Sequence, residues 1–161
     1  MAANKLLDVY LNDHLAGATA GRDLARKLAE DTVGTPVAPF MEGLLADIDA
    51  DRQSLEGVMT RLDVERQTAK QAGAWLTEKV SRLRFSQPVT GSRDLSLFME
   101  METLELGILG KLSMWRTLRE TQGGDPRLAG VDLDALVKRA QEQADSLEPY
   151  RRDAAARAFS A

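Results

Sequence analysis

The sequence predicts an all-helical protein, and its composition and periodicity both indicate this class. Aromatic residues make up only 5% of the chain, and Val and Ile are scarce beside Leu and Ala, which favours helices over strands. Apolar residues recur at alternating spacings of three and four, so they share one face of a helix. This pattern divides the 161 residues into four long segments and one shorter segment. We therefore expect a single helical bundle domain over residues 1–161.

The first predicted helix covers about residues 4–31 and ends before Gly34 and Pro36. Its apolar face consists of Leu7, Leu11, His14, Ala18, Gly21, Ala25 and Leu28. Gly17 and Gly21 each weaken a helix by about 1 kcal/mol relative to alanine. Two small residues spaced four apart permit a neighbouring helix to approach closely, and we expect such packing to offset this cost.

The second predicted helix covers about residues 36–62, and one charged residue interrupts its apolar face. That face consists of Leu44, Ile48, Asp51, Leu55, Val58 and Leu62. A shorter third helix is expected at about residues 65–84. Its apolar face includes Trp75, Leu76, Val80 and Leu83. A loop over residues 85–92, which contains Pro88 and Gly91, follows this helix.

The fourth predicted helix covers about residues 92–121 and ends at the strong stop signal Gly123-Gly124-Asp125-Pro126. Its apolar face consists of Phe98, Met101, Glu105, Ile108, Leu112 and Trp115. Asp132 is placed to cap the last helix. The face of that helix consists of Leu133, Val137, Ala140, Ala144, Leu147, Arg151 and Ala154. Pro149 lies inside the pattern and is expected to kink the helix or to mark a boundary.

The lengths of the segments and of their connections predict how the helices are arranged. Four helices of about 26–28 residues would each be roughly 40 Å long, as in a four-helix bundle. Short loops make the first two and the last two long helices antiparallel hairpins. The long connection between the hairpins allows the second and fourth segments to run parallel, as two hairpins joined by a crossover that contains a short helix. An up-down bundle with a fifth helix packed outside is the alternative.

Two short stretches carry a resemblance to a known family. They are Leu11-Asn12-Asp13-His14-Leu15-Ala16-Gly17-Ala18 in the first helix and Met99-Glu100-Met101-Glu102-Thr103-Leu104-Glu105 in the fourth segment. With these stretches the chain resembles the ferritin-like superfamily, in its rubrerythrin-related and small stress-protein branch. The resemblance implies a ferritin-like four-helix bundle, two iron or manganese ions between the helices, chemistry on oxygen, peroxide or stored iron, and assembly as a homodimer.

Polar residues near the middle of three predicted helices are the candidate site. His14, Asp51 and Glu105 interrupt the apolar faces of their helices at similar heights, and Glu102 lies one turn from Glu105. Carboxylates with an imidazole suit iron, manganese or zinc. A complete paired-metal site of this superfamily also uses a Glu-x-x-His sequence from each of two helices. The chain contains no such sequence and only one histidine, so the ligand set is degenerate.

Two interpretations of these polar residues follow. In the first they form a hydrogen-bonded polar cluster without a metal, because buried carboxylates need partners. Arg52 and Arg151 would then supply the opposite charge, and His14 would donate a hydrogen bond to Asp51 or Glu105. In the second, His14, Asp51, Glu102 and Glu105 bind iron or manganese. We expect the first, with no cofactor and no catalytic residue.

Composition excludes several other classes of function. The chain has no cysteine, so it has no disulfide, no thiolate metal site and no cysteine nucleophile. The formal net charge is −4 without a basic cluster, which is atypical of a protein whose main partner is nucleic acid. No apolar run approaches the roughly 20 residues that span a bilayer. The expected compartment is the cytoplasm.

The sequence therefore predicts a non-catalytic ferritin-like bundle that acts in a stress response or as a helical interaction module. The alternative is a metal-binding oxidoreductase or iron-handling protein of the same superfamily. A homodimer through helix faces is expected from the resemblance. The apolar face of the third helix would either cover the bundle or contact another subunit.

Overall fold

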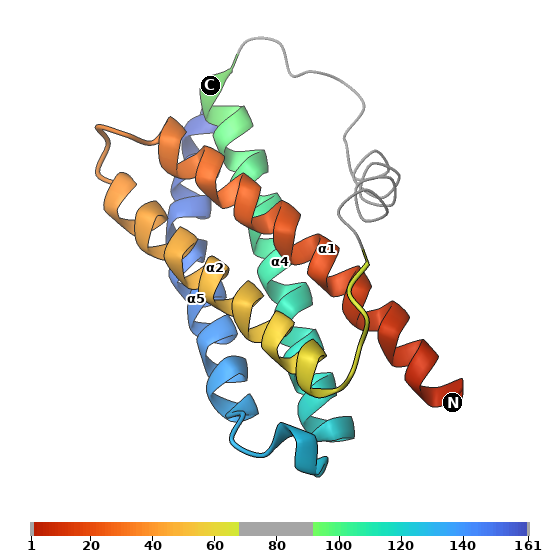
Figure 1. The fold of residues 1–161 in the computed structure, drawn as a ribbon. Helices are drawn as coiled ribbons and strands as arrows, with labels where there is room; N and C mark the ends of the chain where they lie inside the picture. The colour runs from red at the N-terminus through yellow and green to blue at the C-terminus, as the bar shows by residue number, and fades with distance from the viewer. Residues whose placement is uncertain (1, 68–91, 161) are drawn as a thin grey trace.

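The computed structural model describes residues 2–67 and 92–160 and shows four long helices in that part of the chain (Figure 1). They are α1 (Ala2–Asp31), α2 (Ala38–Arg61), α4 (Arg93–Gln122) and α5 (Leu133–Phe159), with the short 3-10 helix η1 (Pro126–Leu128) between the last two. The described residues include no β-strand. The all-helical prediction is confirmed, and the four long segments lie where the periodicity predicted them.

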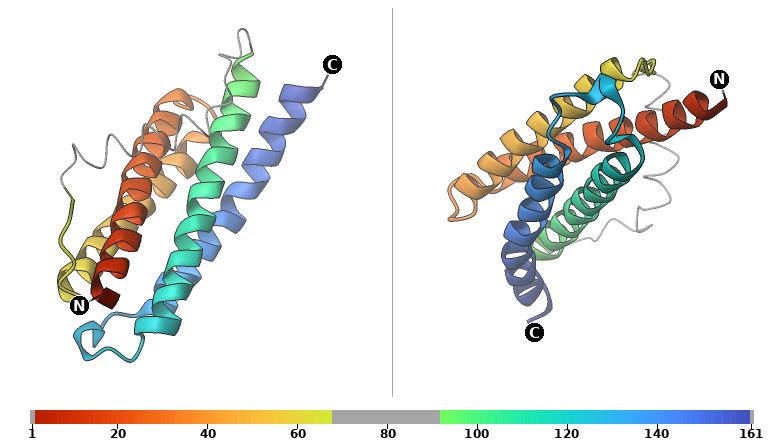
Figure 2. Two further views of the ribbon diagram at one scale, coloured as in Figure 1. Left: turned by 90° about the vertical axis from the view of Figure 1, so that its right-hand side faces the viewer. Right: turned by 90° about the horizontal axis from the view of Figure 1, so that it is seen from below.

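The helices form two hairpins that pack against each other (Figure 2). The amino-terminal part of α1 lies with the carboxy-terminal parts of α2 and α4 and the start of α5 in one core cluster. The opposite ends of the same helices form the second cluster. It follows that α1 and α2 are antiparallel, that α4 and α5 are antiparallel, and that α2 and α4 run in the same direction. Figure 1 shows this shared direction, because the chain descends through both helices.

The two clusters fill the two ends of the bundle with large apolar side chains. The first includes Leu11, Leu55, Met59, Leu62, Leu112, Trp115 and Leu118. The second includes Leu28, Met41, Leu44, Ile48, Met101, Leu104, Ile108 and Leu147. Each fully buried side chain of this size contributes roughly 1.5–3 kcal/mol relative to its exposed state. The middle of the bundle, between the clusters, is where polar side chains enter the interior.

The helix ends follow the capping signals of the sequence. The side chain of Ser92 accepts a hydrogen bond from the backbone N–H of Leu95 at the start of α4. Asp132 does the same for the N–H of Ala135 at the start of α5, as predicted. Helix α4 ends directly before the Gly-Gly-Asp-Pro stretch. Pro149 lies within α5, which continues to Phe159, so it does not mark the boundary that we considered.

Asn12 on α1 forms hydrogen bonds with the segment that follows α2. The Asn12 side-chain amide donates to the carbonyl oxygens of Asp8 at 2.8 Å and of Glu65 at 2.9 Å. Its own oxygen accepts from the backbone N–H of Gln67 at 2.8 Å. Residues 65–67 are not helical. The rest of the predicted third helix, with Trp75, Leu76, Val80 and Leu83, lies outside the described residues.

Candidate functional site

Asp51 is the one charged residue in the described part of the chain that is fully buried, with 2% of its surface exposed. The ammonium of Lys111 on α4 donates to Asp51 Oδ2 over 2.5 Å, and the Gln143 amide on α5 donates to the same oxygen over 2.9 Å. Arg139 on α5 donates through Nε to Oδ1 over 2.6 Å. Lys111 also donates to the Gln143 side-chain oxygen. We call Asp51, Lys111, Arg139 and Gln143 the mid-bundle network.

The mid-bundle network joins α2, α4 and α5 around one carboxylate. Asp51 carries one negative charge, and Lys111 and Arg139 carry one positive charge each. The Lys111 side chain is 14% exposed and the Arg139 side chain is 36% exposed, so Arg139 is the less buried of the two cations. A buried charge is tolerated only when partners of opposite charge and hydrogen bonds replace the lost hydration. Here both Asp51 oxygens have donors, and these donors come from the protein.

Burial lowers the pKa of the Lys111 ammonium below its usual value of 10.5. Loss of hydration disfavours the charged form and is the largest cause, and the positive charge of Arg139 acts in the same direction. The attraction and hydrogen bond of Asp51, and a weaker attraction from Asp47, oppose this change. Lys111 is therefore held in a site where its charge depends on the Asp51 carboxylate.

Glu102 and Glu105 belong to a second cluster, around Arg151 of α5. Arg151 Nε lies 3.0 Å from a Glu105 oxygen and 2.7 Å from a Glu148 oxygen, and Arg151 NH1 lies 3.6 Å from Glu102. The predicted pairing of Arg151 with these carboxylates is present. Burial is the main cause that raises the pKa of Glu105 above 4.5, while Arg151 opposes the change and the neighbouring carboxylates Glu148 and Glu102 add to it.

His14 lies on α1 and contacts the ring of Tyr10 edge-on, with 4.7 Å between the ring centres. The polar residues that we expected together near the middle of the bundle thus belong to separate clusters, because Asp51 is bound by the mid-bundle network and the two glutamates surround Arg151. Arg52, the other predicted partner of Asp51, instead pairs with Glu56 at 2.6 Å and Asp49 at 3.4 Å. Residues 2–67 and 92–160 contain no group of three histidine or acidic side chains arranged to hold a metal ion.

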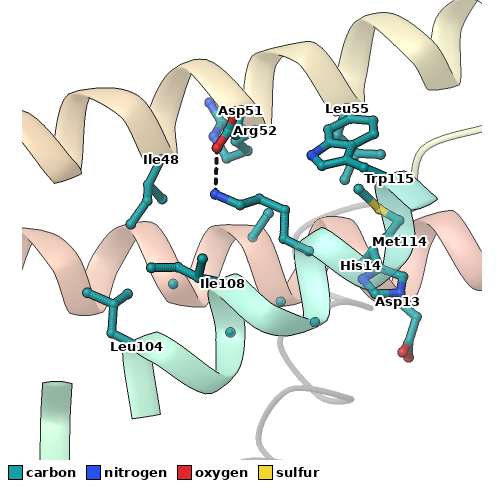
Figure 3. Close-up of a pocket in the computed structure, with 16 residues that line it drawn as sticks. Asp13, His14, Ile48, Asp51, Arg52, Leu55, Leu104, Ile108, Met114 and Trp115 are labelled. Atoms are coloured by element: carbon teal, nitrogen blue, oxygen red, sulfur yellow. Dashed lines mark hydrogen bonds and ion pairs between the residues drawn. The ribbon is translucent and has the colours of Figure 1, made fainter. Parts of the chain in front are cut away.

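A cavity of about 210 Å³ lies beside the mid-bundle network, between α1, α2 and α4 (Figure 3). Most of its wall is apolar and consists of Ile48, Leu55, Leu104, Ile108, Met114 and Trp115. Asp51, Arg52 and Lys111 are polar residues in the wall. His14 and Asp13 lie at its edge, where Figure 3 shows the Asp13 carboxylate directed away from Asp51.

Four glycines line the same cavity: Gly17 and Gly21 from α1, and Gly107 and Gly110 from α4. A Cβ atom placed on any of them would meet no atom of another element within 4 Å. The expectation that Gly17 and Gly21 allow a helix to approach closely is therefore wrong. These glycines leave open space, and Gly17 and Gly107 are themselves exposed, so the cavity opens between α1 and α4.

Lys111, Arg139 and Gln143 are the members of the mid-bundle network that sequence reasoning missed. A signal for two of them was present, because Lys111 follows Leu104 and Ile108 at helical spacing and precedes Trp115. Gln143 similarly lies between Ala140 and Leu147 on the buried side of α5. A single polar residue in an otherwise apolar row indicates that this residue enters the interior and pairs with another polar group there, as Asp51 does on α2.

No protein-family model matches this chain, and no curated protein or solved structure matches it either. None of the described helices is both long and apolar enough to cross a membrane.

Proposed function

We propose that this chain is a non-catalytic helical bundle of the ferritin-like type, which acts in the cytoplasm as a stress-related interaction module without a metal centre. The stress-related part rests on the resemblance in residues 11–18 and 99–105. The parallel course of α2 and α4 supports the ferritin-like part, because two hairpins joined by a long crossover have this arrangement.

The observation that carries the metal-free part of the proposal is the ion pair between Asp51 and Lys111. A carboxylate that binds a metal ion must offer an oxygen lone pair in a position that the ion can reach. Both oxygens of Asp51 accept hydrogen bonds from Lys111, Gln143 and Arg139. An ammonium and a guanidinium thus take the place beside the carboxylate that a divalent cation would need. Binding of a cation would require Lys111 to leave, with its charge uncompensated.

The test is the metal content of the purified protein. The chain is loaded anaerobically with ferrous iron and manganese, passed through gel filtration and analysed by plasma mass spectrometry. We expect far less than one ion per chain, and the same value for the His14→Ala and Glu105→Gln variants. One or two ions per chain in the unmodified protein, lost in these variants, would contradict the proposal and support an iron- or manganese-dependent oxidoreductase.

A homodimer through helix faces is part of the same proposal. Leu106 and Leu109 on α4 are 61% and 41% exposed, and Leu6 and Val9 on α1 are 74% and 61% exposed, which supports a contact between copies. Light scattering after gel filtration should give twice the chain mass of 17.7 kDa. The double variant Leu106→Lys/Leu109→Lys should give the mass of one chain. A single-chain mass for the unmodified protein would contradict this part.

A further inference from the structure

The cavity beside the mid-bundle network is lined by four glycines that lie inside helices. Glycine inside a helix is unfavourable relative to alanine. Gly17, Gly21, Gly107 and Gly110 all lie inside α1 or α4, and none of them has a neighbouring element within 4 Å of a Cβ position. Close helix packing therefore does not explain them. What the four share is the cavity that they line.

Lys111 supplies a hydrogen-bond donor in the wall of this cavity. An ammonium has three N–H groups, and two of those of Lys111 are directed to Asp51 and Gln143. The mid-bundle network also contains two cations for one carboxylate. The charge of Arg52, which lines the cavity too, is already compensated by Glu56 and Asp49.

The size and chemistry of the cavity together select a class of ligand. An apolar cavity of about 150 Å³ in another protein binds benzene, and this one has about 210 Å³. We propose that the cavity binds a small monocarboxylic acid with a compact apolar or aromatic body. The apolar body contacts Ile48 and Ile108, and the carboxylate accepts a hydrogen bond from the Lys111 ammonium. This ligand site goes beyond the proposed function and rests on it in one respect, because a metal ion at Asp51 would displace Lys111.

Benzoate is the probe, and isothermal titration calorimetry of the full chain at neutral pH is the measurement. We expect saturable binding of one benzoate per chain. Benzyl alcohol, which keeps the ring but lacks the charge, should bind at least about tenfold more weakly, because hydrogen bonds to a charged group are stronger than neutral ones. Lys111→Met, which removes the ammonium and keeps an apolar side chain, should also weaken benzoate binding.

Paired glycine variants separate the loss of the cavity from effects on folding. Gly17→Ala/Gly107→Ala adds two methyl groups to the cavity and should weaken benzoate binding by about tenfold or more. The control is Gly43→Ala/Gly57→Ala, since both of these exposed glycines lie in α2, neither lines this cavity, and neither has a neighbour near a Cβ position. It should bind benzoate as the unmodified protein does.

Three results would overturn the inference. The first is the absence of saturable benzoate binding at concentrations up to about 10 mM, which is weaker than a specific site of this kind should be. The second is equal benzoate affinity in the cavity variant and its control. The third is binding of benzyl alcohol as tight as that of benzoate, which would exclude recognition of the carboxylate.

Discussion

The Lys111 ammonium lies 2.5 Å from Oδ2 of Asp51, although the two residues are 60 positions apart in the chain. This ion pair connects α2 to α4, the two helices that belong to different hairpins and run in the same direction. Gln143 and Arg139 extend it to α5. One buried carboxylate thus links the two hairpins, so its replacement should lower the stability of the whole bundle.

Replacement of Asp51 should be strongly destabilising. Asp51→Asn keeps the shape of the side chain but leaves Lys111 and Arg139 without a counter-charge, and removal of one partner from a buried ion pair costs about 3–5 kcal/mol. The control is Glu42→Gln, a change of an exposed carboxylate on the same helix, which should change stability by no more than about 0.5 kcal/mol. Urea denaturation measures both. Equal effects of the two variants would contradict the role of Asp51.

The lowered pKa of Lys111 predicts how stability changes at alkaline pH. Because the pKa in the folded state lies below 10.5, the folded chain loses this proton before the unfolded chain does. The unfolded state therefore binds more protons between these two pKa values, and the contribution of Lys111 to stability rises as pH rises through that window.

The Lys111→Met variant isolates this contribution from those of other groups. The free energy of unfolding of the unmodified protein, minus that of the variant, should increase as pH rises toward 10.5. Urea denaturation at a series of alkaline pH values measures this difference. A difference that decreases over the same range would show that the folded state raises the pKa of Lys111.

Glu105 should not stabilise the fold at neutral pH despite its contact with Arg151. Its pKa is raised by burial and by the neighbouring carboxylates, so the folded state binds this proton more tightly than the unfolded state. Its contribution to stability is therefore lost as pH rises from 4.5 through the folded-state pKa.

Glu105→Gln tests this expectation by chemical denaturation at pH 7. We expect the variant to be at least as stable as the unmodified protein, because the unfavourable charge is gone. Glu120→Gln, an exposed change on the same helix, should have an effect within about 0.5 kcal/mol. A clear loss of stability in Glu105→Gln would mean that the Arg151 pair outweighs burial.

Replacement of the glycines that line the cavity by alanine should raise the free energy of unfolding. In an open helical position glycine is less favourable than alanine by about 0.5–1 kcal/mol, so Gly17→Ala/Gly107→Ala should stabilise the protein by about 1–2 kcal/mol. The α2 control pair, Gly43→Ala/Gly57→Ala, should gain a similar amount. Thermal or urea unfolding measures both variants. Destabilisation of the cavity pair alone would mean that these glycines are required by the fold.

The helices were predictable from the sequence because the signals that define them are local. The apolar period identifies a buried face from side chains within a few turns, and the Asp132 cap and the Gly-Gly-Asp-Pro stretch define helix ends. Asp51 was likewise identified as an interior carboxylate, since it replaces an apolar residue in a row that runs from Leu44 to Leu62.

The partners of Asp51 were not predictable in the same way. Periodicity gives the face of each helix but not its rotation or height relative to a helix that follows 60 or 88 residues later. Long side chains add to the difficulty, because Lys111 and Arg139 can reach an interior carboxylate from positions that are themselves not fully buried. Arg52, adjacent to Asp51 in sequence, pairs with Glu56 and Asp49 on its own helix instead.

The central claim is that Asp51 is compensated by Lys111 and not by a metal ion. A double-mutant cycle in the presence of a chelator tests it most directly, with urea denaturation of the unmodified protein, Asp51→Asn, Lys111→Met and the variant with both changes. We predict a coupling energy of at least about 1.5 kcal/mol, since residues in one buried ion-pair network are strongly coupled. Additive effects of the two changes, or a fold that the chelator alone destabilises, would contradict the claim.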